Sequence, residues 1–336
     1  MRSIIYWSML ACFLMTSILG ASQTEGKPSI INLMIVTDAP ASTVQGHENV
    51  SGSSLLNLYN EINGRNLVAT VFSTQEFINT PSRLILTQIG FSSEFELAMS
   101  GNNTDEKLAT ESFAGQKAIL ETSKRYVEAC KICGKNEIAV NGFMPQSFAQ
   151  NKDTYKALDD LLIKYNAGFQ AGVLYAPGHE NAVWPYLVEG HKFYAVPVST
   201  YTQSGKKVVL QDSYFSDSEL GASEWYDALA GKFDEIQGKD EPMVISLTTT
   251  VSGSGDYFDA LKRFIDYATS KKASFVTTNQ LVDMTKAGVR NVSELPATNE
   301  SGECLTCDQS NSNANITVST DNTTQAAASK AETATS

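Results

Sequence analysis

Short apolar runs of strand length alternate with longer stretches of helical period through the middle of the chain. The first run covers residues 30–36 and stops at Thr37-Asp38-Ala39-Pro40, where a carboxylate is followed by a proline. Buried strands read as apolar runs of about four to eight residues bounded by turn-forming residues. The same pattern predicts further strands over residues 67–72, 83–89, 95–99, 138–140, 171–175, 193–198, 243–247 and 274–277.

Helical period is clearest over residues 256–271, where apolar side chains recur at a spacing of three and four. Two more helices are expected over residues 110–129 and 153–165. Polar residues crowd around the start of the second, and we expect them to cap that helix, with hydrogen bonding to a glycan as the alternative. This polar cluster consists of Gln146, Gln150, Asn151, Asp153, Thr154 and Tyr155.

Strands that alternate with helices about eight times in succession predict parallel strands joined by crossover helices. We therefore expect a closed or nearly closed α/β barrel over residues 29–290, with an open doubly wound sheet as the alternative. Functional side chains of such barrels lie at the carboxyl ends of the strands. Asp38 is the first candidate on this ground.

The two ends of the chain differ in composition from the middle. Residues 1–22 combine a charged start, an apolar stretch and small residues, as in a secretory signal peptide, and a retained membrane anchor is the alternative. Residues 291–336 are rich in Ser, Thr and Asn and hold too few large apolar residues to fold, so they predict a disordered tail. We expect a mature protein without a membrane span.

Six Asn-x-Ser/Thr sequons are present, and four fall in the last fifty residues. This clustering behind a signal peptide predicts a glycosylated protein that is secreted or at the cell surface. The expected glycosylation sites are Asn49, Asn102, Asn291, Asn299, Asn315 and Asn322. The formal net charge of −12 disfavours nucleic acid and anionic membranes as partners.

Four cysteines form two C-x-x-C pairs, Cys130 with Cys133 and Cys304 with Cys307. This spacing suits each half of a four-thiolate zinc site. Because the second pair lies in the predicted tail and exported proteins meet an oxidising environment, disulfides are the preferred interpretation. The bonds either link the tail to the domain or close each pair locally.

An aromatic-rich segment, residues 175–186, follows one of the predicted strands. It predicts a carbohydrate-binding loop at the barrel mouth, with Trp184 and Tyr186 as stacking platforms and His179 or Glu180 as polar contacts. The alternative is a loop that packs on its own aromatic side chains. Of the other two histidines, His191 is expected to be a surface or structural residue, and His47 is within reach of a relocated metal site.

The order of these elements resembles the NodB-type polysaccharide deacetylases, a carbohydrate esterase family with a distorted (β/α) barrel. The resemblance covers about residues 29–284. Its matching segments are residues 34–40 at the first aspartate motif, 67–73, 95–101 before the metal histidines, Gly142-Phe143-Met144-Pro145 at the G-F-R-P turn, and 273–281. The resemblance implies a metal held by one Asp and two His, with a second Asp as base on metal-bound water.

Most of the residues that this chemistry needs are replaced. Asp38 matches the metal-binding Asp, but Thr37 stands at the catalytic Asp, and Ser100 and Thr104 stand at the two histidines. Met144 replaces the Arg that orients the catalytic carboxylate, and Thr248 replaces the late His. Since zinc prefers imidazole and thiolate to hydroxyl ligands, we expect Asp38 to be a vestigial metal ligand, with no catalytic residue and no cofactor.

Three functions follow from these observations. The first is a catalytically impaired, deacetylase-like protein that binds carbohydrate or a cell-envelope glycan through Asp38, His179, Trp184 and Tyr186. The second is an active carbohydrate deacetylase or amidohydrolase, acting on acetyl ester or C–N bonds, with zinc or another divalent metal held by Asp38 and a histidine. The third is a structural surface glycoprotein whose barrel is a spacer for the tail.

Overall fold

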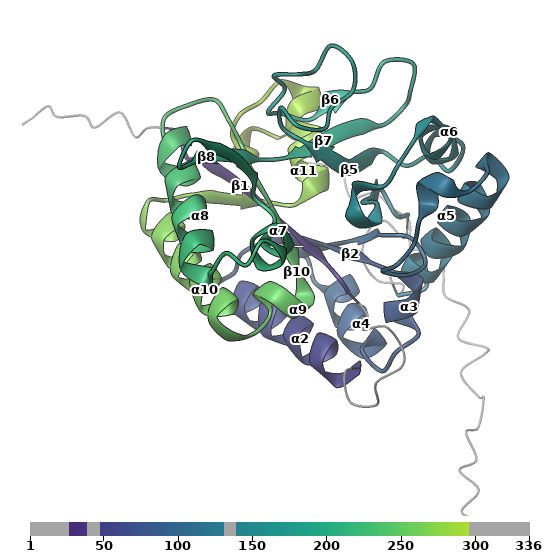
Figure 1. Ribbon diagram of the computed structural model, residues 1–336, viewed down its shortest axis with the longest axis horizontal. Coiled ribbons are helices and arrows are strands. Elements are labelled where there is room, and N and C mark those ends of the chain that lie inside the picture. The colour runs from purple at the N-terminus through teal and green to yellow at the C-terminus, as the bar shows by residue number, and fades with distance from the viewer. Residues whose placement is uncertain (1–26, 39–47, 131–138, 296–336) are drawn as a thin grey trace, which may run out of the picture. The chain divides into compact units, whose positions relative to one another are not determined.

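A computed structural model describes residues 27–38, 48–130 and 139–295 of the chain (Figure 1). Within these ranges the strands are β1 Ile30–Val36, β2 Ala69–Ser73, β3 Phe95–Met99, β4 Gly142–Phe143, β5 Tyr165–Gln170, β6 Tyr186–Leu187, β7 Tyr194–Val198, β8 Thr200–Gln203, β9 Lys206–Val209, β10 Met243–Thr248 and β11 Ser274–Val276. The α-helices are α2 Glu48–Gly64, α3 Gln75–Ile78, α4 Arg83–Phe91, α5 Phe113–Glu128, α6 Lys152–Asp160, α7 Asp212–Asp217, α8 Ala222–Ile236, α9 Thr249–Ser252, α10 Gly255–Ser270 and α11 Thr278–Ala287. Short 3₁₀ helices cover Leu108–Thr110, Gln146–Phe148 and Val292–Glu294.

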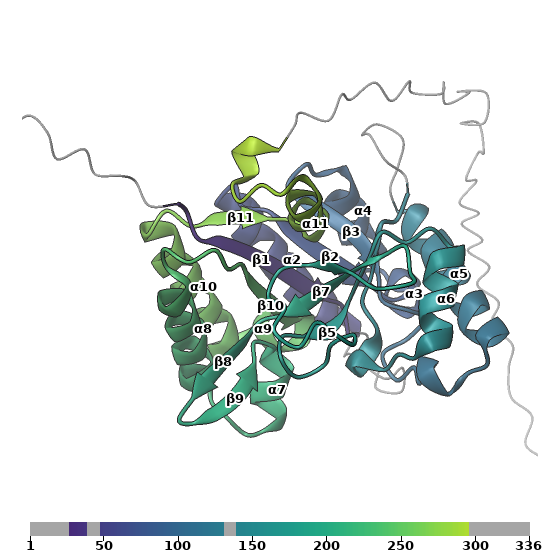
Figure 2. The ribbon, with the colours of Figure 1, turned by 90° about the horizontal axis from the view of Figure 1, so that it is seen from above.

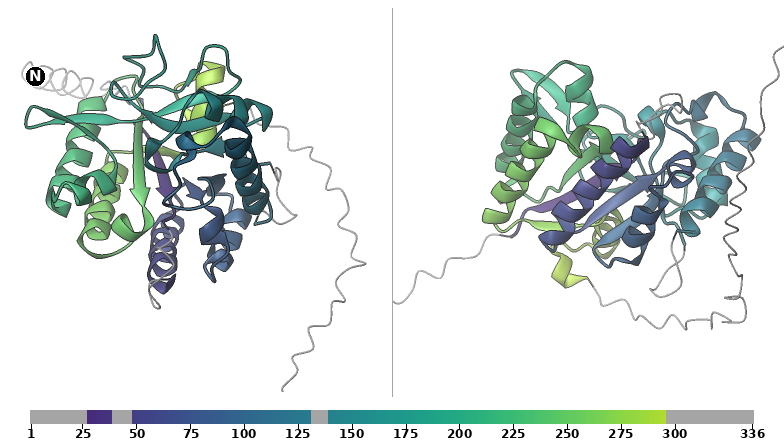
Figure 3. Two further views of the ribbon diagram at one scale, coloured as in Figure 1. Left: turned by 45° about the vertical axis from the view of Figure 1, so that its right-hand side comes forward. Right: turned by 90° about the horizontal axis from the view of Figure 1, so that it is seen from below.

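Seven strands pair in the order β10-β1-β2-β3-β4-β5-β7, each parallel to its neighbours. Strand β6 adds an antiparallel edge to β7, and β11 pairs with the first half of β1. Figure 3 shows β10 in green running beside β1 in purple. The two ends of this path meet where Ser199 N–H, just after β7, donates to Val244 O of β10 (2.9 Å). Ser246 N–H of β10 donates to Leu210 O, just after β9 (2.9 Å), so the β8–β9 hairpin also closes on this seam. The predicted barrel is confirmed, and it is distorted at this seam.

Alternate residues of β1 face opposite sides of the sheet, as strand geometry requires. Ile31, Leu33 and Ile35 belong to the large cluster packed under the outer helices, whereas Ile30 and Met34 belong to a second cluster inside the barrel. The outer layer includes α2, α4, α5, α6, α8 and α10 (Figure 1).

Helix α11 packs against the amino-terminal ends of the strands (Figure 2). The backbone N–H of Thr278 donates to Thr70 Oγ1 (2.8 Å) at the start of β2, and that of Asn279 donates to Glu96 Oε2 (2.8 Å) at the start of β3. The opposite end of the barrel, where Asp38 lies, is therefore the one left for a functional site.

The predicted strand over residues 83–89 is wrong, because this segment forms α4. Its apolar run is short enough to fit either structure. In the helix, Leu86 and Ile89 are buried at a spacing of three, while Leu84 is 75% exposed.

The predicted strand over residues 171–175 is also displaced, since β5 ends at Gln170. The predicted helix over 153–165 ends at Asp160, and Tyr165 begins β5. Residues 139–140 form no strand, and β4 follows at Gly142. The two errors around β5 share a cause, since β5 contains Asn166 and Gly168, which interrupt an apolar strand pattern.

The ordered domain continues past residue 290. Val292 and Leu295 pack against the cluster inside the barrel, although the sequence places them in the tail. The predicted signal peptide and residues 296–336 lie outside the described ranges. In the ranges that are described, no helix combines the length and apolar character needed to cross a bilayer.

Candidate functional site

The carboxyl ends of β10, β1 and β3 bring several residues that match positions of the family motifs to one end of the barrel. Val36 is in register with both Phe72 and Thr248, and Phe72 is in register with Ala98. Asp38 lies two residues after Val36, and Ser100 lies two residues after Ala98, so each continues the same face of its strand. The structure thus places Asp38, Ser100 and Thr248 around the barrel mouth, as the order of the motifs implies.

The Asp38 carboxylate is held by the first turn of α9. Thr249 Oγ1 and Thr250 Oγ1 donate to Oδ1 and Oδ2 respectively, and Thr250 N–H donates to Oδ1 (3.1 Å). The Asp38 N–H donates in turn to Thr249 Oγ1 (3.1 Å). Asp38 therefore joins the end of β1 to the start of α9 through both of its carboxylate oxygens.

The hydroxyl groups at the other family positions also bond within the protein. Ser100 is buried, and its Oγ donates to Met144 O (2.7 Å) and accepts from Gln146 Nε2 (2.7 Å). Thr37 Oγ1 accepts from the N–H of Thr74 (3.4 Å). Met144 is buried in the cluster inside the barrel, and Thr104 is half-buried in the loop after β3.

These donors do not fit a catalytic divalent metal. One carboxylate, hydroxyls and a thioether offer no imidazole or thiolate, which zinc sites use. Among residues 27–38, 48–130 and 139–295, no group of three or more His, Cys, Asp and Glu is placed to hold a metal ion. His47 lies outside these ranges, so its proposed part in a relocated site stays a prediction.

A second carboxylate at this end, Asp212, is missed by the sequence reasoning, because no motif or apolar pattern singles it out. It is buried, and it accepts from the N–H groups of Thr248 (2.9 and 2.8 Å), Ser252 (3.1 Å) and Ser213 (2.7 Å). Burial raises the pKa of Asp212 to about 7, and the N–H donors oppose that rise without cancelling it. Asp212 is fully buried, and its bonds to Thr248 and Ser252 tie together the two ends of the segment from the end of β10 through α9.

Two of the predicted carbohydrate-binding residues pack on each other. The rings of His179 and Tyr186 are stacked, with centroids 3.9 Å apart and planes 10° apart. Tyr186 is 8% exposed, and its hydroxyl accepts from Ala176 N–H (3.0 Å). One face of the Tyr186 ring is thus covered by His179, as in the alternative where the loop packs on its own aromatic side chains.

Trp184 lies away from Asp38. Its indole N–H donates to Asp240 O (3.0 Å), before β10 begins, and the Arg290 guanidinium carbon lies 4.2 Å from its ring centroid. Asp240 precedes the amino end of β10, whereas Asp38 lies beside its carboxyl end. The length of β10 alone is about 17 Å. The structure does not bring Trp184 and Asp38 into one site.

His191 has a structural role, as predicted. Its Nδ1 lies 2.7 Å from Asp159 Oδ2, and its ring packs against Tyr155 and Phe193. These contacts tie the segment before β7 to the end of α6.

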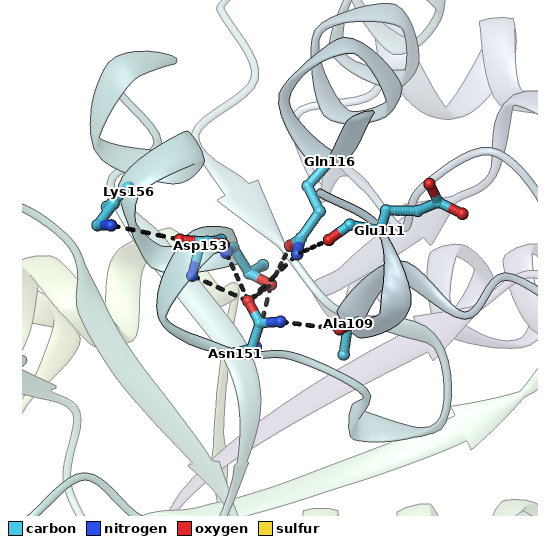
Figure 4. Close-up of polar contacts among 7 residues, drawn as sticks. Ala109, Glu111, Gln116, Asn151, Asp153 and Lys156 are labelled. Atoms are coloured by element: carbon cyan, nitrogen blue, oxygen red, sulfur yellow. Dashed lines mark hydrogen bonds and ion pairs between the residues drawn. The ribbon is translucent and has the colours of Figure 1, made fainter. Parts of the chain in front are cut away.

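The polar cluster near residue 151 caps α6, as expected (Figure 4). Asn151 Oδ1 accepts from the N–H groups of Asp153 (2.9 Å) and Thr154 (3.1 Å), and Asn151 Nδ2 donates to Ala109 O (2.8 Å). Gln116 Nε2 donates to Asn151 Oδ1 (3.2 Å) and to Glu111 O (3.0 Å). These side chains are used within the protein, which argues against the glycan-binding alternative for this cluster.

The cysteine and sequon predictions fall largely outside the described ranges. Cys130 is buried and forms no disulfide with another described residue, while Cys133, Cys304 and Cys307 lie outside those ranges. Asn102 is half-buried, and Asn291 Oδ1 accepts from Ser293 N–H (3.1 Å). The side chain of Asn49 and all of Asn299, Asn315 and Asn322 are not described, so glycosylation stays a prediction.

No protein-family model matches the sequence, and no curated protein matches it. Solved structures do match. A protein of Mycobacterium smegmatis assigned as a polysaccharide deacetylase has a TM-score of 0.61 at 15% identity, covering 80% of this chain and 93% of its own. A similarly assigned protein of Pseudomonas aeruginosa PAO1 has a TM-score of 0.59 at 15% identity, covering 76% and 90%. The allantoinase PuuE has a TM-score of 0.60 at 14% identity, covering 79% and 92%.

At these identities the likeness establishes the fold. The chain has the distorted barrel of the NodB-type polysaccharide deacetylases, as its motif order implies. The nearly equal TM-score of an allantoinase means that the fold by itself does not select the substrate.

Proposed function

We propose that this protein is a secreted, polysaccharide-deacetylase-like protein that has lost metal-dependent hydrolysis and acts by binding carbohydrate. The observation that carries the loss of hydrolysis is the bonding of Asp38. Its two carboxylate oxygens accept hydrogen bonds from Thr249 and Thr250 where a metal would need them.

A metal at this site would compete with those bonds and gain little. It would have to displace three donors from Asp38, and the nearby Ser100 hydroxyl is already bonded to Met144 and Gln146. Deacetylation by this fold needs a metal to lower the pKa of water and to polarise the acetyl carbonyl. Without nitrogen ligands, we expect no hydroxide to form at neutral pH.

The carbohydrate part of the proposal has a different basis. Two of the similar structures are assigned as polysaccharide deacetylases, and the fold covers most of both chains. The second candidate function, hydrolysis of a C–N bond, is favoured by the similarity to an allantoinase. It requires a metal held by Asp38 and a histidine, which the described residues do not provide.

We expect the purified protein to bind at least one glycan on a glycan array and to release no acetate from acetylated chito-oligosaccharides or acetylxylan. Metal analysis should find no stoichiometric zinc that depends on Asp38. A variant lacking Cys130, Cys133, Cys304 and Cys307 separates cysteine-bound zinc from zinc at the barrel mouth. Zinc that survives this change, together with hydrolysis of an acetyl or C–N bond that Asp38→Ala abolishes, would establish an active hydrolase instead.

Secretion is supported by the composition of residues 1–22 and by the sequons. When the full chain is expressed in a eukaryotic secretory host, the protein in the medium should begin near residue 23. Enzymatic removal of N-glycans should lower its mass. A product that stays in the cell, keeps Met1 and has an unchanged mass after treatment would refute secretion and glycosylation together.

A further inference from the structure

A solvent-open cavity of about 180 Å³, lined by both polar and apolar side chains, lies on the side of the barrel near the β8–β9 hairpin and α8. Figure 2 shows that hairpin beside α8. The polar lining of the cavity includes two carboxylates, two ammonium groups, an amide and a hydroxyl. They belong to Glu180, Glu241, Lys207, Lys232, Asn181 and Thr200. We call it the Lys232 cavity. Glu241 precedes β10, whereas Asp38 bonds to residues beyond its other end, so the cavity is separate from the barrel mouth.

Lys232 makes this cavity unusual. Its side chain is 6% exposed, and its ammonium group pairs with Glu241, which is 17% exposed, and with Glu235 (3.4 Å). Burying such a pair is costly, and apolar side chains of similar volume often stabilise a protein equally well. The pair therefore places fixed opposite charges on the cavity wall, where a polar ligand can meet them.

Part of the lining is open to solvent, since Glu180, Asn181 and Lys207 are exposed and can meet an incoming ligand directly. Asn181 makes no side-chain hydrogen bond to any residue that the structure describes, and Lys207 Nζ is 3.5 Å from Gly172 O, at the limit of a bond. Gly172 has a φ of +65°, which favours glycine, and the Lys207 ammonium group lies close above it. The donors and acceptors that remain are suited to a solute.

Size and charge narrow the class of ligand. The cavity has a volume of about 180 Å³ and is open to solvent, so it accommodates one sugar residue, either free or at the end of a longer chain. The positive charges of the two ammonium groups cancel the negative charges of the two carboxylates. An anionic ligand would be repelled by both carboxylates. An apolar ligand would leave the charges without water. A neutral polyhydroxylated ligand satisfies donors and acceptors together.

We infer that the Lys232 cavity binds one neutral sugar residue, an inference that rests on the proposed carbohydrate-binding function and gives it a location. Glu180 and Asn181 belong to the aromatic-rich loop in which a carbohydrate site is predicted from the sequence. The binding groups are thus polar residues of that loop together with Lys207, Lys232 and Glu241, and not the stacked ring of Tyr186.

Isothermal titration of the full-length protein with N-acetylglucosamine, its tetramer and xylotetraose tests this location. Lys207→Ala and Asn181→Ala should each raise the Kd by at least about tenfold, as expected for losing a hydrogen bond to a charged or buried group. Lys206→Ala is the matched control, because Lys206 and Lys207 are adjacent exposed residues of β9 and only Lys207 lines the cavity. Equal affinity for monomer and tetramer indicates a free sugar as ligand, and preference for a tetramer indicates a chain end.

The outcomes separate the two proposals. If the wild-type protein binds no glycan in titration or on the array, the carbohydrate-binding function fails and the cavity inference fails with it. If a saccharide binds and its affinity is unchanged by Lys207→Ala and Asn181→Ala, only the cavity inference is refuted. Loss of binding on Trp184→Ala in that case would move the site to the Trp184 surface.

Discussion

Replacing Asp212 by Asn is expected to remove a large part of the pH dependence of stability between pH 4 and 7. The folded-state pKa of Asp212 is raised to about 7, above the ordinary value of 3.8. Its contribution to stability is therefore fully present below about pH 4 and is lost as the pH rises through about 7. A rise of about three pKa units corresponds to a change on the order of 4 kcal/mol.

The measurement is urea unfolding of the wild type and the variant from pH 4 to 8. The wild-type stability minus that of Asp212→Asn should fall as the pH rises, because only the wild type carries the buried carboxyl group. Asp217→Asn, an exposed position at the end of the same helix, should show no such trend. A difference that instead grows with pH would mean that the N–H donors of Thr248, Ser252 and Ser213 outweigh burial.

Gly142→Ala is expected to destabilise the protein by at least about 3 kcal/mol, the upper range for overpacking a core. A Cβ at this position would fall well inside van der Waals contact of the Tyr165 ring. Tyr165 is buried inside the barrel, and its hydroxyl donates to Glu96 Oε1 (2.8 Å). The ring cannot withdraw without breaking that bond and disturbing the interior cluster.

Chemical unfolding of Gly142→Ala and Gly64→Ala makes the comparison direct. Gly64 ends α2, and a Cβ added there would meet no described atom within 4 Å, so alanine should be neutral or stabilise by about 0.5–1 kcal/mol. Adding Tyr165→Leu to Gly142→Ala should cost less than the sum of the two single changes, since the smaller side chain relieves the overlap. Strict additivity would show that Tyr165 is not what excludes a side chain from position 142.

The Gly142-Phe143-Met144-Pro145 segment illustrates how far sequence reasoning reaches. Its likeness to a family turn singles it out, but its first two residues form β4 instead, beyond the strand predicted over residues 138–140. The reason for the glycine is a contact with Tyr165, which lies on the next strand although its apolar spacing predicts a helix. Such a contact depends on strand pairing, and the local pattern holds no record of it.

In the candidate site, too, the sequence shows some features and only the fold shows others. A carboxylate at the end of the first apolar run is visible in the sequence, and so is the loss of histidines at the positions of Ser100 and Thr104. The partners of Asp38 are not, because Thr249 and Thr250 are more than two hundred residues away and reach it only through the pairing of β1 with β10.

The sequence by itself determined the alternation of buried strands and amphipathic helices, the position of Asp38 at a strand end and the cap of α6, since these depend on residues a few positions apart. Tertiary structure alone decided that residues 83–91 are helical, that His179 covers Tyr186, that Trp184 lies far from Asp38, and that Lys232 and Glu241 face a common cavity. The helix over residues 83–91 and the place of Trp184 depend on contacts with segments distant in the chain. His179 with Tyr186 and Lys232 with Glu241 are fewer than ten residues apart, but they are brought together by the path of an irregular segment, which hydrophobic periodicity does not describe.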